Sequence, residues 1–130
     1  MAFLIEFDPK NNVLRARLQG RVTDDILLDC YATLARYAAS HPACRAIADV
    51  SGVAEFSVSS AAIRQLAKAP PAIPAPYMRI FVAPQAHMYG MARMFQIITE
   101  ESRPNFHVVR TMDEAYRLLQ VECPEFGPVS

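Results

Sequence analysis

The sequence predicts an α/β fold with a single mixed sheet of about five strands and about four helices. Two observations support this prediction. Two apolar segments joined by a turn rich in Pro and Asn predict an antiparallel hairpin at the N-terminus, and the rest of the chain alternates between helical and strand periodicity. Alternating strands and helices favour parallel pairing through right-handed crossovers, so the hairpin and the later strands are expected to form one sheet.

The hairpin is predicted from residues 3–7 and 13–20, which flank the turn sequence DPKNN. In the second segment apolar residues alternate with those of a wetter face: Leu14, Ala16 and Leu18 against Val13, Arg15 and Arg17. Residues 23–40 then change to the helical period. Either Thr23 or Asp24 is expected to cap the start of this helix.

The remaining elements are expected in the order strand, helix, strand, helix, strand, helix. Their ranges are 45–50, 59–69, 77–83, 84–101, 106–111 and 111–121. Four prolines within residues 70–76 exclude a helix or central strand there and predict an extended connector on the surface. Thr111 and Glu114 form a capping box at the last helix. We expect one domain over residues 1–121 and a surface tail over 122–130.

The composition limits the classes of partner and the location that we expect for this protein. The chain has 130 residues with 13 basic and 13 acidic side chains, so nucleic acid is not an expected partner, since phosphate binding needs basic excess. Three widely spaced cysteines without a CxxC motif indicate reduced thiols, and we expect a cytoplasmic protein. The apolar run at the N-terminus is broken by Glu6 and Asp8 and is too short for a transmembrane segment.

The segment from His87 to Glu101 is rich in methionine, which suits either a flexible ligand site or a protein core. On a helical wheel one side holds Met88, Met91, Ala92, Met94, Phe95, Ile98 and Thr99. This spacing favours a core stripe over a ligand site. Gly90 and Ile97 lie beyond the polar edge of the wheel. They indicate a second contact surface, and we expect a homodimer to use it.

A binding site is expected where parallel strands end. The ends at 49–51, 82–85 and 109–111 each precede a helix start, and free amides at helix starts favour a carboxylate, a phosphate or another anionic group. The candidate ligand-binding residues are Asp49, Ser59, Ser60, His87, Tyr89 and Arg93. The alternatives are structural: the serines only cap their helix, and Arg93 is a solvated side chain resting on Tyr89 and not a polar clamp with it.

Catalytic motifs are absent from the sequence. The three histidines have no metal-ligand spacing, and there is no GxSxG elbow or phosphate-binding glycine loop. We therefore expect no metal, no cofactor and no enzymatic activity. An enzyme remains an alternative only if Asp49, His87, Tyr89 and Arg93 share one cleft.

Residues 48–67 and 82–101, and most specifically DVSGVAEF (49–56) and YGMARMFQ (89–96), carry a family resemblance. The chain resembles the small bacterial STAS-like proteins that are similar to sporulation anti-sigma-factor antagonists and are grouped with the CRAL-TRIO lipid-transfer fold. The resemblance covers nearly the whole chain. It implies a sheet of four or five strands with helices, no catalysis, and a regulatory or ligand-binding role.

The same resemblance bears on Ser59 and Ser60. Classical STAS antagonists carry Asp-Ser-Ser-Gly before a helix, with a serine that a kinase phosphorylates, whereas this chain has Val58 and Ala61 around its two serines. The first hypothesis is a non-enzymatic module that binds a small anionic or lipid-like ligand, or a protein partner. The alternative is a partner-switching anti-sigma-factor antagonist regulated by phosphorylation of Ser59 or Ser60.

Overall fold

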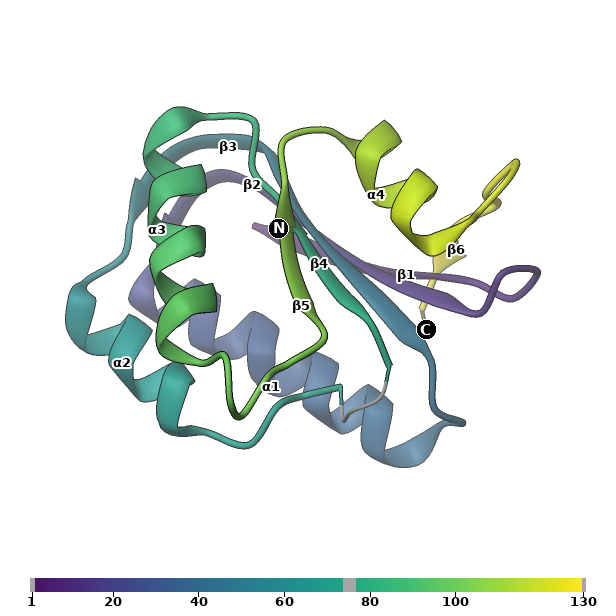
Figure 1. Ribbon diagram of the computed structural model, residues 1–130, viewed down its shortest axis with the longest axis horizontal. Coiled ribbons are helices and arrows are strands. Elements are labelled where there is room, and N and C mark those ends of the chain that lie inside the picture. The colour runs from purple at the N-terminus through teal and green to yellow at the C-terminus, as the bar shows by residue number, and fades with distance from the viewer. Residues whose placement is uncertain (1, 74–76, 130) are drawn as a thin grey trace.

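The computed structural model describes residues 2–73 and 77–129 and confirms the predicted fold class. The described residues form one mixed six-stranded sheet with four helices (Figure 1). The strands are β1 (Phe3–Asp8), β2 (Val13–Thr23), β3 (Arg45–Ser57), β4 (Arg79–Val82), β5 (Phe106–Val109) and β6 (Gly127–Pro128). The helices are α1 (Asp24–Ser40), α2 (Ser60–Lys68), α3 (Ala86–Ile98) and α4 (Met112–Leu119).

The strand order is β5-β4-β3-β2-β1-β6. β1 and β2 form the expected antiparallel hairpin, and β2 to β5 are parallel. The sheet has six strands because residues of the tail pair with β1, Gly127 lying opposite Phe7. The tail thus contributes a strand that the sequence pattern did not predict, β6, which occupies an edge that the hairpin alone would leave unpaired.

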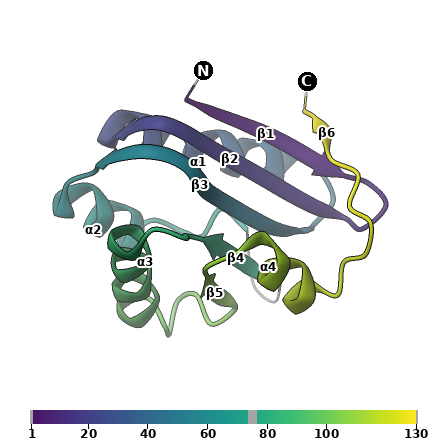
Figure 2. The same cartoon turned by 90° about the horizontal axis from the view of Figure 1, so that it is seen from above.

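The helices divide between the two faces of the sheet. In β2, Leu14 packs in a cluster with α1 residues, whereas its neighbour Val13 packs in a cluster with α4 residues. Figure 2 shows α4 on the near side of the strands and α1 behind them. We call the side covered by α1, α2 and α3 the three-helix face, and the other the α4 face.

Three helices begin at hydroxyl caps that the sequence indicates. The hydroxyl of Thr23 accepts from the amide of Ile26, Ser59 caps α2, and Thr111 caps α4. The cap of α1 is thus Thr23, while the carboxylate of Asp24 accepts from the hydroxyl and the amide of Ser59. These contacts tie the start of α1 to the start of α2.

β3 is much longer than the expected strand at 45–50. It follows β2 through two register shifts, at Arg17/Gln19 and Gly20/Arg21. Gly20 adopts a φ of +70°, and a Cβ at Gly52 would lie 3.3 Å from Cβ of Gln19, so both positions favour glycine. β3 extends beyond the end of β4, so its carbonyls after Asp49 have no strand partner on the side of β4. The side-chain amide of Gln85 donates to two of these carbonyls.

The proline-rich connector is described only in part. Ile73 in it is 3% exposed and belongs to the core of the three-helix face, so this point of the connector is anchored and not a surface position. The expected extended conformation at 74–76 lies outside the described residues. None of the described helices has the length and apolar character needed to cross a membrane.

Candidate functional site

An apolar cavity of about 150 Å³ lies between α1, α2, α3 and the sheet. Its lining comes from six elements and consists of Leu27, Phe56, Ile63, Leu66, Phe81, Met88, Met91, Ala92, Phe95 and Phe106. Every one of these side chains is apolar. The cavity is partly open to solvent, and because ligand sites are typically concave, apolar and few per protein, it is the strongest candidate site in the described part of the chain.

Local sequence patterns explain the lining. On α3 the lining residues have the i, i+3, i+4, i+7 spacing of one helical face, beginning at Met88 and ending at Phe95. On α2 Ile63 and Leu66 are three apart and share a face. Met88 and Met91 are unbranched side chains with three rotatable bonds, which can adjust to the shape of an occupant.

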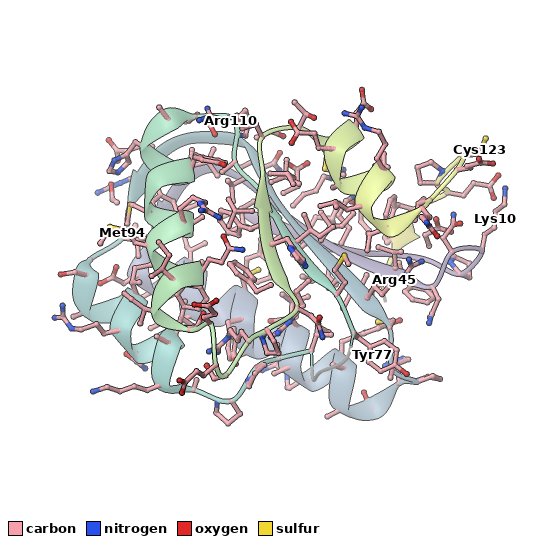
Figure 3. All side chains as sticks on the ribbon, viewed as in Figure 1. Lys10, Arg45, Tyr77, Met94, Arg110 and Cys123 are labelled. Atoms are coloured by element: carbon pink, nitrogen blue, oxygen red, sulfur yellow. The ribbon has the colours of Figure 1, made fainter. Side chains whose placement is uncertain are left out.

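The methionine helix departs from its predicted core stripe. Met94 and Ile98, expected in the core, are 63% and 64% exposed, and Ile97 is 65% exposed. The physical reason is that α3 lies beside the short edge strand β5 and against α2, which cover only part of its circumference. With Gly90 these residues form an exposed apolar stripe, and Figure 3 shows Met94 directed away from the fold.

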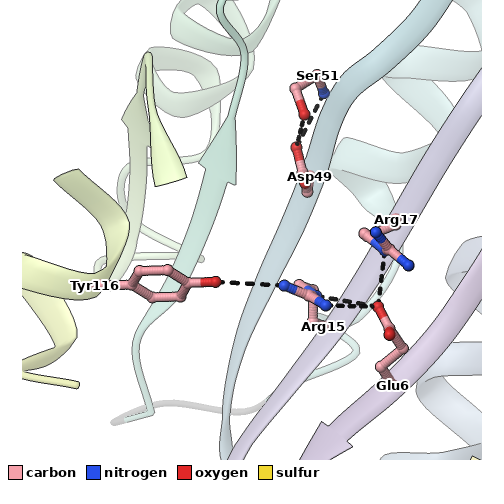
Figure 4. Close-up of polar contacts among 6 residues, drawn as sticks. All are labelled: Glu6, Arg15, Arg17, Asp49, Ser51 and Tyr116. Carbon is pink, nitrogen blue, oxygen red and sulfur yellow. Dashed lines mark hydrogen bonds and ion pairs between the residues drawn. The ribbon is translucent and has the colours of Figure 1, made fainter. Parts of the chain in front are cut away.

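The candidate polar residues lie at separate positions along the sheet and its helices. Asp49 lies within β3, level with the last residues of β4 and β5, on the α4 face. Its Oδ1 accepts from the amide and the hydroxyl of Ser51 (Figure 4). Ser59 and the exposed Ser60 follow the far end of β3, where Ser59 contacts α1 on the other side of the sheet.

The clamp of Tyr89 and Arg93 is also not formed. The guanidinium of Arg110 lies 4.0 Å from the centre of the Tyr89 ring, and Nη1 of Arg93 donates to Oε1 of Gln96. His87 is exposed at the start of α3. Within the described part of the chain, no hydrogen bond or ion pair joins any two members of the set Asp49, His87, Tyr89 and Arg93, which the enzyme alternative needs in one cleft.

The α4 face carries a polar network that the sequence did not indicate (Figure 4). Oε1 of the buried Glu6 accepts from Arg15 at 2.9 Å and from Arg17 at 2.8 Å. Arg15 also donates to the Tyr116 hydroxyl and lies 3.9 Å from the centre of the Phe126 ring. The network is internally satisfied and holds the hairpin to α4 and the tail, which is a structural role.

Two buried arginines lie on the three-helix face, and sequence reasoning missed both. Arg103 is 4% exposed and donates to the carbonyls of Leu66, Ala67 and Ala69, so it closes the end of α2. Arg79 is 8% exposed. The available signal was a charged residue within the apolar run YMRIFVA, because a strand buried on both faces is normally apolar throughout.

The chain matches no protein-family model and no curated protein. Among residues 2–73 and 77–129, no three His, Cys, Asp or Glu side chains are grouped so as to hold a metal ion. The apolar cavity is therefore the feature of the described residues that bears most directly on function.

Proposed function

We propose that the protein is a non-enzymatic, STAS-like binding module whose cavity between α1, α2 and α3 takes a small apolar group. The wholly apolar lining of about 150 Å³ is the single observation that supports this. An apolar cavity of this size accepts a benzene-sized molecule, so the bound group is about one ring or a short acyl chain. This site lies under the helices, apart from the rim at the strand ends that the sequence predicts.

A matched pair of variants tests the proposal. Ala92 is 7% exposed and lines the cavity, whereas Ala86 is exposed at the start of the same helix. We expect Ala92→Leu to fill the cavity and to weaken binding of benzene, toluene or 1-hexanol at least tenfold, while Ala86→Leu leaves binding unchanged. The measurement is a ¹H–¹⁵N NMR titration, in which shift changes should centre on the lining residues.

The titration has results that support the proposal and results that contradict it. Saturable shifts around Phe81, Phe95 and Phe106 that disappear in Ala92→Leu support the proposal. Absence of saturable binding of all three probes to the unmodified chain overturns it, and so does binding that both alanine variants weaken equally.

A second candidate function, partner switching by phosphorylation, is favoured by one specific contact. Hydrogen bonds from the side chain and the backbone of Ser59 lower the pKa of the Asp24 carboxyl, which accepts at 2.7 Å from the exposed serine's hydroxyl. A phosphate on Ser59 would place at least one further negative charge beside that carboxylate. Repulsion would then separate the starts of α1 and α2, next to the cavity residues Leu27 and Ile63.

Mass spectrometry of the protein isolated from its own cells under several growth conditions tests this candidate. A phosphate localised to Ser59 or Ser60 supports it, and unmodified serines under all conditions argue against it. Asp24→Asn is the matched variant, because it keeps the geometry of the contact and removes the repulsion that a phosphate would feel.

A further inference from the structure

Arg79 is a buried cation with unused hydrogen-bond donors. It begins β4 and is 8% exposed, and since its neighbour Ile80 belongs to the core of the α4 face, its side chain lies on the three-helix face with that of Phe81. Its Nε and Nη2 have no hydrogen-bond partner in the described part of the chain. Burying a guanidinium in this way is costly, because no acceptor replaces the water that it loses.

Two further groups accompany Arg79. The hydroxyl of Tyr31 on α1 is also buried without a partner, and it interacts electrostatically with Arg79. Burial, together with the positive charge of the nearby Arg103, lowers the pKa of Arg79. Neither arginine has an ion pair with any carboxylate of residues 2–73 or 77–129. The two buried arginines Arg79 and Arg103 thus lie near each other, and among the described residues neither has an ion-paired carboxylate.

Arg79 and Tyr31 do not line the apolar cavity themselves, but they adjoin residues that do. Phe81 lies two residues after Arg79 on the same face, about 7 Å along the strand, and Phe106 lies directly opposite Arg79 in the register of β4 and β5. Leu27 precedes Tyr31 by four residues, which is one turn of α1. Phe81, Phe106 and Leu27 all line the cavity. The unpaired guanidinium is therefore two strand residues from the lining, and the unpaired hydroxyl belongs to a residue one helical turn from it.

We propose that Arg79 and Tyr31 form an anion subsite at this end of the cavity, and that the ligand is a small carboxylate with a ring or a short acyl chain. This inference rests on the proposed function and adds the chemical class of the ligand. A planar carboxylate accepts two parallel N–H bonds from a guanidinium and a third from a hydroxyl. A phosphate dianion is less suitable, because it would bring a second charge into a buried site.

The test compares ligands that share an apolar part and differ in charge. Phenylacetate and hexanoate are titrated by calorimetry and NMR beside 2-phenylethanol and 1-hexanol, with phenyl phosphate as the larger anion. We expect the carboxylates to bind about 10- to 100-fold more tightly than the matched alcohols, the usual range for hydrogen bonds to a charged group. Phenyl phosphate is expected to bind more weakly than phenylacetate.

Arg79→Met, Tyr31→Phe and the exposed control Arg93→Met identify the residues. Arg79→Met should abolish the preference for carboxylates and leave alcohol binding unchanged, whereas Tyr31→Phe should reduce the preference by about three- to tenfold and Arg93→Met should not alter it. The unliganded Arg79→Met protein should have a Tm equal to or above that of the parent, because an unpaired buried charge is replaced by an apolar chain of similar length. A merely structural arginine would give a lower Tm.

Failure of this inference is distinguishable from failure of the proposed function. Equal binding of carboxylates and alcohols by the parent chain overturns the anion subsite and keeps the apolar site. Retention of the carboxylate preference in both Arg79→Met and Tyr31→Phe also overturns it. Absence of binding by every probe overturns both. If Arg79→Met does not fold, Tyr31→Phe and Arg79→Lys, which keeps the charge and loses the two-pronged geometry, decide the question.

Discussion

The two faces of the sheet differ in how closely their side chains pack and in whether their buried polar groups are paired. On the α4 face, Val13, Ile47 and Ile80 are at most 1% exposed, and the buried acid Glu6 meets two arginines. On the three-helix face a cavity of about 150 Å³ remains among larger side chains, and two donor nitrogens of Arg79 have no partner.

The difference indicates that the α4 face contributes more to the stability of the unliganded fold and that the three-helix face has room for a ligand. Dense packing and satisfied polar groups stabilise the unliganded state. Side chains that border an unfilled cavity lose van der Waals contacts, and an unpaired buried guanidinium loses its hydration without gaining a hydrogen bond. Arg45 ties the short helix α4 to the hairpin, because it donates to the carbonyl of Leu119 at the end of α4 and to that of Asn11 in the β1–β2 turn. The face with three helices keeps the cavity, although it is covered by three of the four helices.

Cysteine labelling is the largest expected effect and reports whether the three-helix face opens. Burial, with a smaller contribution from Asp29, raises the pKa of the Cys30 thiol from about 9 to about 12, which lowers its thiolate fraction about 1,000-fold. Burial also raises the pKa of Cys44. Cys123 is exposed on the tail (Figure 3). We expect a maleimide at pH 8 to modify Cys123 alone, as followed by mass spectrometry.

Denaturant is the control for that labelling, since all three thiols should react once the chain unfolds. Modification of native Cys30 at a rate within tenfold of that of Cys123 would contradict a closed core around α1, and the cavity would then be a feature of a fluctuating layer.

Truncation of isoleucine compares the packing of the two faces directly. Ile80→Ala removes a side chain that is 1% exposed on the α4 face and should lower the free energy of unfolding by about 2–5 kcal/mol. Ile63→Ala removes a half-buried side chain that borders the cavity, and its cost should be smaller because fewer atoms surround it. Urea unfolding of both variants measures the difference. Equal losses would show that the two faces are equally well packed.

The charge networks offer a smaller contrast. Glu6→Gln removes the charge from a buried carboxylate that two arginines share, and should lower the free energy of unfolding by about 1–3 kcal/mol. Glu55→Gln is the matched control, because its partner Arg21 is 68% exposed and its own side chain is 60% exposed. The control should change the stability by less than about 1 kcal/mol. A larger loss in Glu55→Gln than in Glu6→Gln would reverse the ranking proposed here.

The smallest effect on the fold concerns the outer surface of α3. We propose that the expected homodimer forms through the apolar stripe of Gly90, Met94, Ile97 and Ile98, three of whose side chains are more than 60% exposed. Ile97→Arg should then convert a dimer to a monomer in light scattering at unchanged Tm within about 1 °C. A parent chain that is monomeric at high micromolar concentration would remove this proposal.

Local sequence signals determined much of the architecture. Hydroxyl caps at Thr23, Ser59 and Thr111, the alternation in β2 and the helical period of α1 each depend on neighbours within about four residues, so they can be recognised without the fold. The order of hairpin and β–α units followed from the same signals, and the sheet formed as expected apart from the sixth strand.

Other features were decided only by tertiary contacts. β3 runs to Ser57 because β2 continues beside it, which moved Asp49 from a strand end to a strand interior. Met94 and Ile98 are exposed because no element formed by the described residues lies over that side of α3, although their spacing alone would suit a core. A helical wheel gives which residues share a face, and only the packed neighbours determine whether that face is covered.

The candidate site belongs to this second class. Its lining comes from six elements, and its proposed polar end joins Tyr31 and Arg79, which are 48 residues apart in the chain. A cavity is the mismatch between side-chain volumes and the space that the backbone encloses, and a single sequence specifies the volumes without the space. The sequence alone therefore determined the elements and their order, and the packing of three helices on one twisted sheet determined where a ligand has room.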